Sequence, residues 1–342
     1  MTIVNYYDYQ QVFGGTSKSR PLNQPYAEKG VFTGFLGPGP TSNIIILGST
    51  LNQPTSFLDT SPMAGGNRNG FLRNPPPNFF AAIQNNIICN TTIDGINWIL
   101  ASSDVTNGIG SGTLGIVTDS LVWLNSGRMV YVNNLCFSYS DDMGVTWTAE
   151  RWTTRYPSLN GFTWQIASDG EVIKGVAGGG RSIQSIDGGE NWTSFSIVYP
   201  NFNSRKCKYV PEIESFLVAG VSSTNDPRAL YAQKGADNPF ILMPTSGITV
   251  TGQMTGITYS PQLNTIVGCN FNRLFQKDGD PAIGGWTEII FPASSSPPDI
   301  YWSNRQELFY TGNALNMFTY DGDSITTYTN FFSVGVSCFG VW

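Results

Sequence analysis

Apolar and polar positions alternate along this chain in short runs, a spacing typical of β-strands rather than helices. An aromatic-bearing run at residues 162–166 is followed by a turn, an apolar run at 172–177 and a short run at 182–185. The same order recurs over residues 257–269 and 300–310. Short β-rich runs separated by Gly, Asn and Asp turns predict antiparallel hairpins. No run sustains a 3.6-residue apolar period, so almost no helix is expected.

A loop motif shows that this order repeats along the chain. Residues 140–147 read SDDMGVTW and residues 185–192 read SIDGGENW, so both fit the pattern S-x-D-x-G-x-[TN]-W. The repeat length is about 47 residues, and seven such units account for most of the chain. Weaker copies continue the series at 44–57, 92–98, 233–240, 278–286 and 320–328.

Four strands in each unit predict an all-β fold, a seven-bladed β-propeller of four-stranded antiparallel blades, with six or eight blades as alternatives. A leftover apolar run at residues 331–338 is expected to return to the first blade and close the ring, which removes open sheet edges. Residues 1–25 fall outside the period and are expected to form an N-terminal arm or an extra strand. Residues 26–342 are then a single propeller domain.

The two strong loops resemble the Asp box of bacterial neuraminidase repeats, which occurs in sialidase-like propellers and in many non-enzymatic ones. The aspartate accepts backbone hydrogen bonds in a tight turn, the glycine supplies a positive φ, and the tryptophan packs between sheets. The resemblance implies structural residues at the periphery, away from a central binding face. These residues are Asp94, Trp98, Asp142, Gly144, Trp147, Asp187, Gly189 and Trp192.

Composition narrows the possible chemistry. The 342 residues carry a net charge of −6 and include no His, so nucleic acid is not an expected partner and the usual general base is missing. Five Cys without C-x-x-C spacing predict neither disulfides nor a zinc site. Neither a signal peptide nor an 18-residue apolar run is evident, so membrane insertion is not expected. We also expect no metal at the Asp-Gly-Asp turns 278–280 and 321–323, and no cofactor.

The enzymatic alternative is a sialidase-like or xyloglucanase-like glycoside hydrolase. The resemblance to sialidases would imply three Arg, a Tyr nucleophile assisted by Glu, and an Asp acid/base. The Arg-Ile-Pro motif of that family is absent, and the eight Glu fall in turns, inside a loop motif or on outer strands. Asp104, Asp119 and Asp299 lie near blade-entry loops and are the candidate carboxylates. No pair among them has a distinctive spacing, so no catalytic residue is predicted.

Possible ligand-binding residues are of two kinds. Large aromatic residues recur at one place in the predicted repeat. They could be platforms on which sugars stack, but their recurrence favours a role in packing between blades. Irregular loops are better binding candidates, particularly 67–77 with Arg68 and Arg73, 105–112 and 294–299. The aromatic residues are Trp123, Trp164, Tyr209, Tyr259 and Trp302.

The uncharged, Asn-rich turns, with 29 Asn against seven Lys in the chain, resemble those of phage tail and capsid accessory proteins. We therefore expect a non-enzymatic virion component, either a structural element or an adhesin for host surface glycans. Residues 1–25 would contact other virion proteins, in a symmetric oligomer or a multi-copy assembly. A secreted or cell-surface location is the alternative, and a cellular assembly factor, as in photosystem assembly propellers, is a third possibility.

Overall fold

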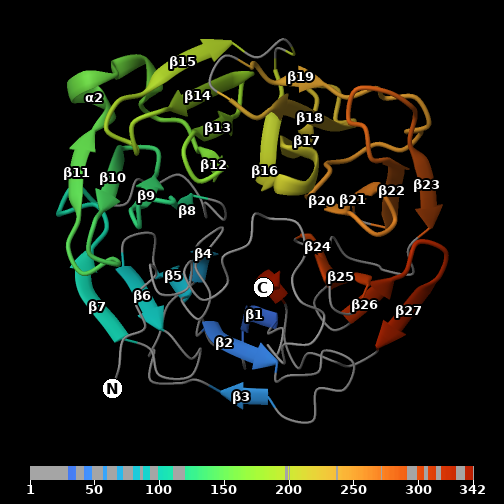
Figure 1. Ribbon diagram of the computed structural model, residues 1–342, viewed down its shortest axis with the longest axis horizontal. Coiled ribbons are helices and arrows are strands. Elements are labelled where there is room, and N and C mark those ends of the chain that lie inside the picture. Colours follow the sequence, from blue (N-terminus) through green and yellow to red (C-terminus); the bar gives the residue numbers. More distant parts are fainter. Residues whose placement is uncertain are drawn as a thin grey trace.

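A computed structural model of the chain shows an all-β fold arranged as a ring of sheets (Figure 1). It describes residues 104–110, 120–196, 199, 201–235, 238–270, 272–290, 299–303, 307–312 and 317–328, together with the backbone of strands β1–β7 and β28. The predicted residues 1–25 lie outside this part of the chain.

The described strands form seven four-stranded antiparallel sheets, which confirms the predicted fold class. The first three sheets contain β1 (Gly30–Phe35), β2 (Ser42–Leu47), β3 (Phe57–Asp59) and β28 (Val336–Val341); β4 (Arg68–Phe71), β5 (Phe80–Gln84), β6 (Ile88–Thr92) and β7 (Ile99–Asp104); and β8 (Leu121–Trp123), β9 (Met129–Val132), β10 (Cys136–Ser140) and β11 (Thr148–Arg151).

The other four sheets follow in chain order. They contain β12 (Gln165–Ser168), β13 (Ile173–Ala177), β14 (Arg181–Ser185) and β15 (Thr193–Ser196); β16 (Asn203–Val210), β17 (Ser215–Val221), β18 (Pro227–Gln233) and β19 (Ile241–Leu242); β20 (Gly256–Ser260), β21 (Thr265–Asn270), β22 (Arg273–Asp278) and β23 (Thr287–Ile290); and β24 (Ile300–Ser303), β25 (Leu308–Gly312), β26 (Met317–Tyr320) and β27 (Ile325–Tyr328).

Each sheet extends outward from the centre of the ring, with its first strand in the chain innermost in six of the seven sheets (Figure 1). The innermost strands β8, β12, β16, β20, β24, β28 and β4 contact one another in that order. In the first sheet, the C-terminal strand β28 pairs antiparallel with β1, with Gly30 opposite Val341. The two ends of the described chain therefore meet in one sheet.

Because successive strands are antiparallel, the connections alternate between two faces of the ring. In the six sheets that begin with their innermost strand, we call the face with the first and third connections the loop face; turn 169–172 and loop 186–192 lie there. The link face has the second connections, such as turn 222–226, and the links between sheets. A hydrogen bond from Gly252 N to Asn225 O, 2.5 Å long, joins neighbouring sheets on the link face.

The core lies between adjacent sheets rather than inside any one of them. Val130 and Phe137 of the third sheet, for example, share a buried cluster with Ile166 and Ile183 of the fourth. Similar clusters join the fourth sheet to the fifth, the fifth to the sixth and the sixth to the seventh. A four-stranded sheet has two apolar faces, and stacking in a ring removes both from water, at roughly 1.5–3 kcal/mol for each large side chain.

Helical structure in the described part of the chain is limited to three short segments, as expected. Helix α2 (Trp152–Arg155) and the 3-10 turn η1 (Pro157–Leu159) link the third sheet to the fourth, and η2 (Pro211–Ile213) is a hairpin turn. The indole of Trp152 is buried and donates a 2.7 Å bond to Asn133 O. Among the residues described, none forms a helix with the length and hydropathy needed to span a membrane.

Candidate functional site

The first strong loop motif folds into a closed turn around Asp142. Its Oδ1 accepts hydrogen bonds from Ser140 Oγ and Thr146 N, both 2.8 Å long, and its Oδ2 accepts one of 2.6 Å from Thr146 Oγ1. The Ser140 hydroxyl in turn accepts the Gly144 N–H at 2.8 Å, and Trp147 Nε1 donates to Gly144 O at 3.1 Å. The carboxylate is therefore used to hold its own loop.

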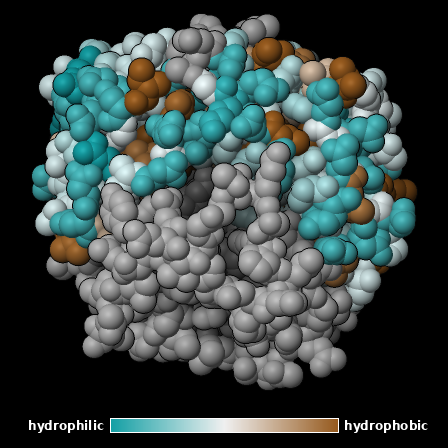
Figure 2. All heavy atoms as spheres, in the orientation of Figure 1, coloured by the Kyte–Doolittle hydropathy of each residue, from teal (hydrophilic) through white to brown (hydrophobic). Residues whose placement is uncertain are grey.

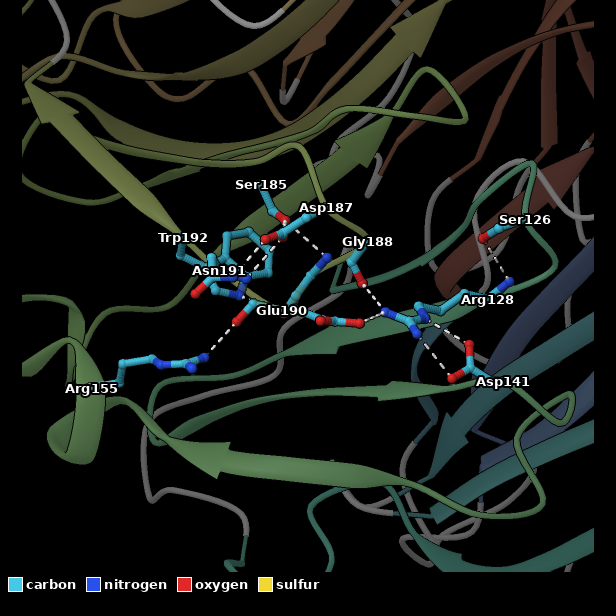
Figure 3. A network of polar contacts seen from close by, with 11 residues as sticks. Ser126, Arg128, Asp141, Arg155, Ser185, Asp187, Gly188, Glu190, Asn191 and Trp192 are labelled. Atoms are coloured by element: carbon cyan, nitrogen blue, oxygen red, sulfur yellow. Dashed lines mark hydrogen bonds and ion pairs between the residues drawn. The ribbon is translucent and has the colours of Figure 1, made fainter.

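The second loop repeats this geometry around Asp187 (Figure 3). Ser185 Oγ and Asn191 N each donate to Asp187 Oδ1 at 2.9 Å, and Trp192 Nε1 donates to Gly189 O at 3.0 Å. Gly189 has φ +87°, a left-handed conformation that favours glycine. Two loops 45 residues apart thus form the same polar network.

Arg128 connects the two loops across adjacent sheets (Figure 3). Its Nε lies 2.6 Å from Asp141 Oδ1 and its Nη1 lies 2.7 Å from Glu190 Oε1. The guanidinium also lies 4.2 Å from the centre of the Tyr139 ring. The hydrogen bond that Arg128 donates to Asp141, together with its contacts to Glu190, raises the pKa of Arg128 above its ordinary value. Arg128 therefore links the third sheet to the fourth on the loop face.

The weaker copies use different contacts to hold their loops. In the sixth sheet, Lys277 is buried, and its ammonium donates to the carbonyls of Asp280 and Ile283, at 2.5 and 2.6 Å. Trp286 Nε1 donates to Pro244 O at 2.8 Å instead of to a glycine of its own loop. Asp94 and Trp98, predicted for the shortened copy, lie outside the described residues.

A charged cluster lies near the centre of the ring, where three innermost strands meet. Lys206 on β16, Gly256 on β20 and Asp299 just before β24 each lie three residues before the inner-strand aromatic of their sheet, Tyr209, Tyr259 and Trp302. They are therefore at one level around the axis. Asp299 has no solvent exposure, and Lys206 has only 3%.

The carboxylate of Asp299 reaches across the sixth sheet to the fifth. Its Oδ1 lies 2.8 Å from Lys208 Nζ, and its Oδ2 lies 3.6 Å from Lys206 Nζ. The Lys208 ammonium also donates to Ile300 O at 2.7 Å. A Cβ on Gly256 would lie 2.7 Å from both the Cα and Oδ1 of Asp299. Glycine at this position thus permits an ion pair between residues of two non-adjacent sheets.

The cluster differs from a glycosidase site, which needs two carboxyls in one cleft. Asp299 is paired with lysine, and Asp104 accepts bonds from Thr106 N and Gly108 N in its own turn. The third candidate carboxylate, Asp119, lies outside the described residues. Glu171 and Glu307, like the other described Glu, lie in turns, loops or outer strands rather than in the cluster.

The described thiols and central phenols are poorly suited to act as nucleophiles. Burial raises the pKa of Cys136 and of Cys269 to about 12, so both stay protonated at neutral pH. Desolvation, together with nearby carboxylates including Asp169, raises the pKa of Tyr209 to about 12. Cys207 is also buried and free of disulfides. Within the described residues, groups of three or more metal-ligating side chains are absent.

The recurring aromatic residues serve mainly as packing. Trp123 and Trp164 are 4% and 0% exposed, which leaves neither ring a free face for a sugar. Tyr209 is partly buried and Tyr259 is buried, each in a core cluster. Trp302 is partly buried and donates through Nε1 to Gln262 Oε1 at 3.0 Å.

Trp164 requires a correction, because it does not occupy the shared place in the repeat. Trp123, Tyr209, Tyr259 and Trp302 lie at corresponding positions near the end of an innermost strand. In the fourth sheet that position belongs to Ala167, and Trp164 lies just before β12. The predicted alignment of this unit with the others was wrong because it was based on the aromatic residue alone.

Only part of the predicted arginines and loops lies within the described residues. Arg68 begins β4, the innermost strand of the second sheet, and Arg73 lies outside the described residues, as do 111–112 and 294–298. Arg128, Lys206 and Lys208 were not predicted from the sequence. The sequence did contain a signal for the two lysines, because residues 205–208 read RKCK, the densest run of cations in the chain.

Comparison with solved structures identifies the architecture. A chain of the crystal structure of a nidogen/laminin complex aligns with 92% of this chain and 98% of its own, at 8% identity and a TM-score of 0.55. A candidate 6-phosphogluconolactonase from Bacteroides uniformis aligns over 93% and 100%, at 12% identity and a TM-score of 0.60. Both of these structures have propeller-like folds. This chain is a β-propeller.

The structural similarity establishes the propeller fold but does not indicate a function. No protein-family model matches the chain, and no curated protein matches its sequence. Propellers of one architecture carry unrelated activities, so function has to be argued from the residues.

Proposed function

We propose that this propeller is a non-enzymatic component of a bacteriophage virion, where it serves as a structural element or as an adhesin that binds host surface glycans. The observation that carries the proposal is how the described carboxylates are used. Asp142, Asp187 and Asp321 accept hydrogen bonds within their own turns, and Asp299 is fully buried beside two lysines. Such carboxylates stabilise a surface and are poorly placed for acid/base chemistry.

We further infer that the two closed loops are Asp boxes of the neuraminidase-repeat type. Their support is the shared network, in which a serine and an aspartate receive the loop N–H groups and the tryptophan donates to the motif glycine. On this interpretation the boxes are structural, and ligands bind elsewhere on the molecule.

The assignment to a particle is tested with virions produced from the genome that encodes the chain. Purified particles are probed by quantitative mass spectrometry and by immunogold labelling with antibodies against the recombinant propeller. We expect stoichiometric copies per particle and labelling at a defined place on its surface. Recovery of the chain only in the soluble fraction of the lysate would refute the virion role.

Deletion of residues 1–25 separates the two parts of the proposal. If these residues attach the propeller, the truncated chain folds with unchanged thermal stability but is missing from purified particles. Normal incorporation of the truncated chain would show that attachment uses the propeller itself.

A further inference from the structure

The described loops between the third and fourth strands of the sheets fall into two classes, according to the charge that holds them. In the third, fourth and seventh sheets a carboxylate accepts N–H groups of its own loop, as Asp142, Asp187 and Asp321 do. In the fifth and sixth sheets a buried ammonium, from Lys174 and Lys277, donates to loop carbonyls instead. Loops at the same place in the repeat therefore contain opposite charges.

Strand register aligns the sixth-sheet loop with the strong motif of the fourth sheet. Asp278 pairs with the first residue of β21, as Ser185 pairs with the first residue of β13. Asp278 thus takes the place of the motif serine, and Asp280 takes that of Asp187. The loop from Asp278 to Trp286 is one residue longer than its counterpart. The sixth-sheet loop is therefore a copy of the motif without its serine.

Lys277 supplies the internal charge of this loop. Its Nζ lies 2.5 Å from Asp280 O, 2.6 Å from Ile283 O and 3.5 Å from Asp278 O. An ammonium has three N–H donors and no acceptor, so converging carbonyl oxygens match it. The side chain is 3% exposed, and Nζ lies 6.0 Å from the centre of the Trp286 ring. The loop therefore encloses the cation that holds it.

The surroundings of Lys277 compensate for the water that its ammonium loses. Desolvation lowers the pKa of this group, whereas the charges of Asp280 and Asp278 act in the opposite direction. Lysine ordinarily lies on a hydrophilic surface, such as the described part of the face in Figure 2. A buried ammonium is tolerated where it is paired and hydrogen-bonded. The carbonyl and carboxylate oxygens of the loop provide both conditions.

Lys174 forms a similar contact between two sheets. It lies on β13 of the fourth sheet, is 1% exposed, and donates through its ammonium to Asn238 O in the loop of the fifth sheet. Asn238 Nδ2 donates in turn to Lys234 O at 2.7 Å, which closes that loop. The strand before this loop ends at Gln233 rather than at a serine. Both of these loops, which lack the motif serine, thus bind a buried ammonium.

We propose that the sixth-sheet loop is a site for a monovalent cation, and that the ammonium of Lys277 is its resident cation. The ligands are backbone carbonyl oxygens, which remain in place when the lysine side chain is shortened. A small alkylammonium ion has the same charge and the same kind of N–H donor as the lost group. It should therefore occupy the vacated site. This inference does not rest on the proposed function.

Chemical rescue of Lys277→Ala in the full chain tests the proposal. The substitution removes the ammonium, so we expect a lower midpoint of thermal unfolding than that of the unsubstituted chain in the same salt. Methylammonium chloride should restore at least half of the lost midpoint. Tetramethylammonium chloride, which has no N–H donor, and NaCl at the same concentration should not. Equal responses to methylammonium and tetramethylammonium would overturn the proposal.

Two further variants separate the cation site from general effects of charge and packing. Lys277→Met keeps an unbranched side chain without a donor, so it should lose stability and gain nothing from methylammonium. Lys234→Ala removes an exposed lysine and should change neither the midpoint nor the response to salts. If Lys277→Ala does not fold in buffer alone, its refolding yield in the two ammonium salts gives the same comparison. Unchanged stability of Lys277→Met would contradict the proposal.

Discussion

At the scale of single residues, hydrogen bonds within the loops control how Asp142 and Asp187 titrate. Partial desolvation acts to raise the pKa of each carboxyl, but the bonds from Thr146 and Ser140 to Asp142 outweigh it. Bonds from Asn191 and Ser185 do the same at Asp187. The pKa of each group in the folded protein therefore lies below its ordinary value.

The lowered pKa values predict a loss of stability in acid. A carboxyl with a depressed pKa in the folded state stabilises the protein above its unfolded pKa of about 3.9, and this contribution disappears as pH falls through the folded pKa. Urea unfolding at pH 6 and pH 3 measures the change. The double variant Asp142→Asn, Asp187→Asn should be less stable at pH 6 and lose less on acidification. An unchanged loss would show that other groups cause the acid sensitivity.

Gly256 permits the central ion pair through its lack of a side chain. Gly256→Ala places a Cβ 2.7 Å from the Asp299 Cα, so backbone must move, and overpacking of this kind costs about 3 kcal/mol. The control is Gly284→Ala, where φ is +79° and nothing lies within 4 Å of the added Cβ, which should cost about 1 kcal/mol. Equal unfolding free energies for the two variants would contradict the close approach.

At the scale of elements, Arg128 joins the third and fourth sheets through two loops. Its partners Asp141 and Glu190 keep 61% and 48% of their side chains exposed, so water weakens each pair. The fork on Asp141 requires the guanidinium shape, which lysine lacks.

We therefore expect Arg128→Lys to lower the free energy of unfolding by about 1 kcal/mol. Arg151→Lys is the matched control, because Arg151 makes one long bond of 3.5 Å to Ile109 O, and it should change stability by less than about 0.5 kcal/mol. A double-mutant cycle of Arg128→Met with Glu190→Gln measures the coupling between the loops. Zero coupling would mean that the Arg128–Glu190 ion pair does not hold the two loops together.

The elements themselves were predictable, because each repeat carries its own strand and turn pattern. The 45-residue spacing of Trp147 and Trp192 gave the length of a unit, and the units at 257–269 and 300–310 matched observed strands. Trp164 was misplaced because an aromatic beside a strand was taken as the aromatic within it. The structure puts Ala167 at that place, where neighbouring side chains supply the packing.

The central cluster could not be derived in the same way. Lys208 and Asp299 are 91 residues apart, and they meet only because closure of the ring brings three innermost strands to one axis. The β-bulge at Arg205 also breaks the alternation on which strand prediction depends. Local patterns therefore predicted the units, whereas contacts across the axis required the assembled ring.

At the scale of the whole molecule, the two strong aspartate loops lie on one face of the ring, where Arg128 joins them. Burial raises the pKa values of Cys136, Cys269 and Tyr209 to about 12, which makes these three groups poorly suited to acid/base chemistry at neutral pH. We propose that the propeller, as an adhesin, binds saccharides without transforming them.

Binding followed by recovery of the ligand tests that claim most directly. The purified chain is incubated with oligosaccharides of the host surface, bound material is quantified, and all sugar is then analysed by chromatography. We predict that oligosaccharide is retained and that all of it is recovered at full length. Shortened products that disappear in a single Asp substitution, such as Asp299→Asn, would contradict the account and identify a glycoside hydrolase.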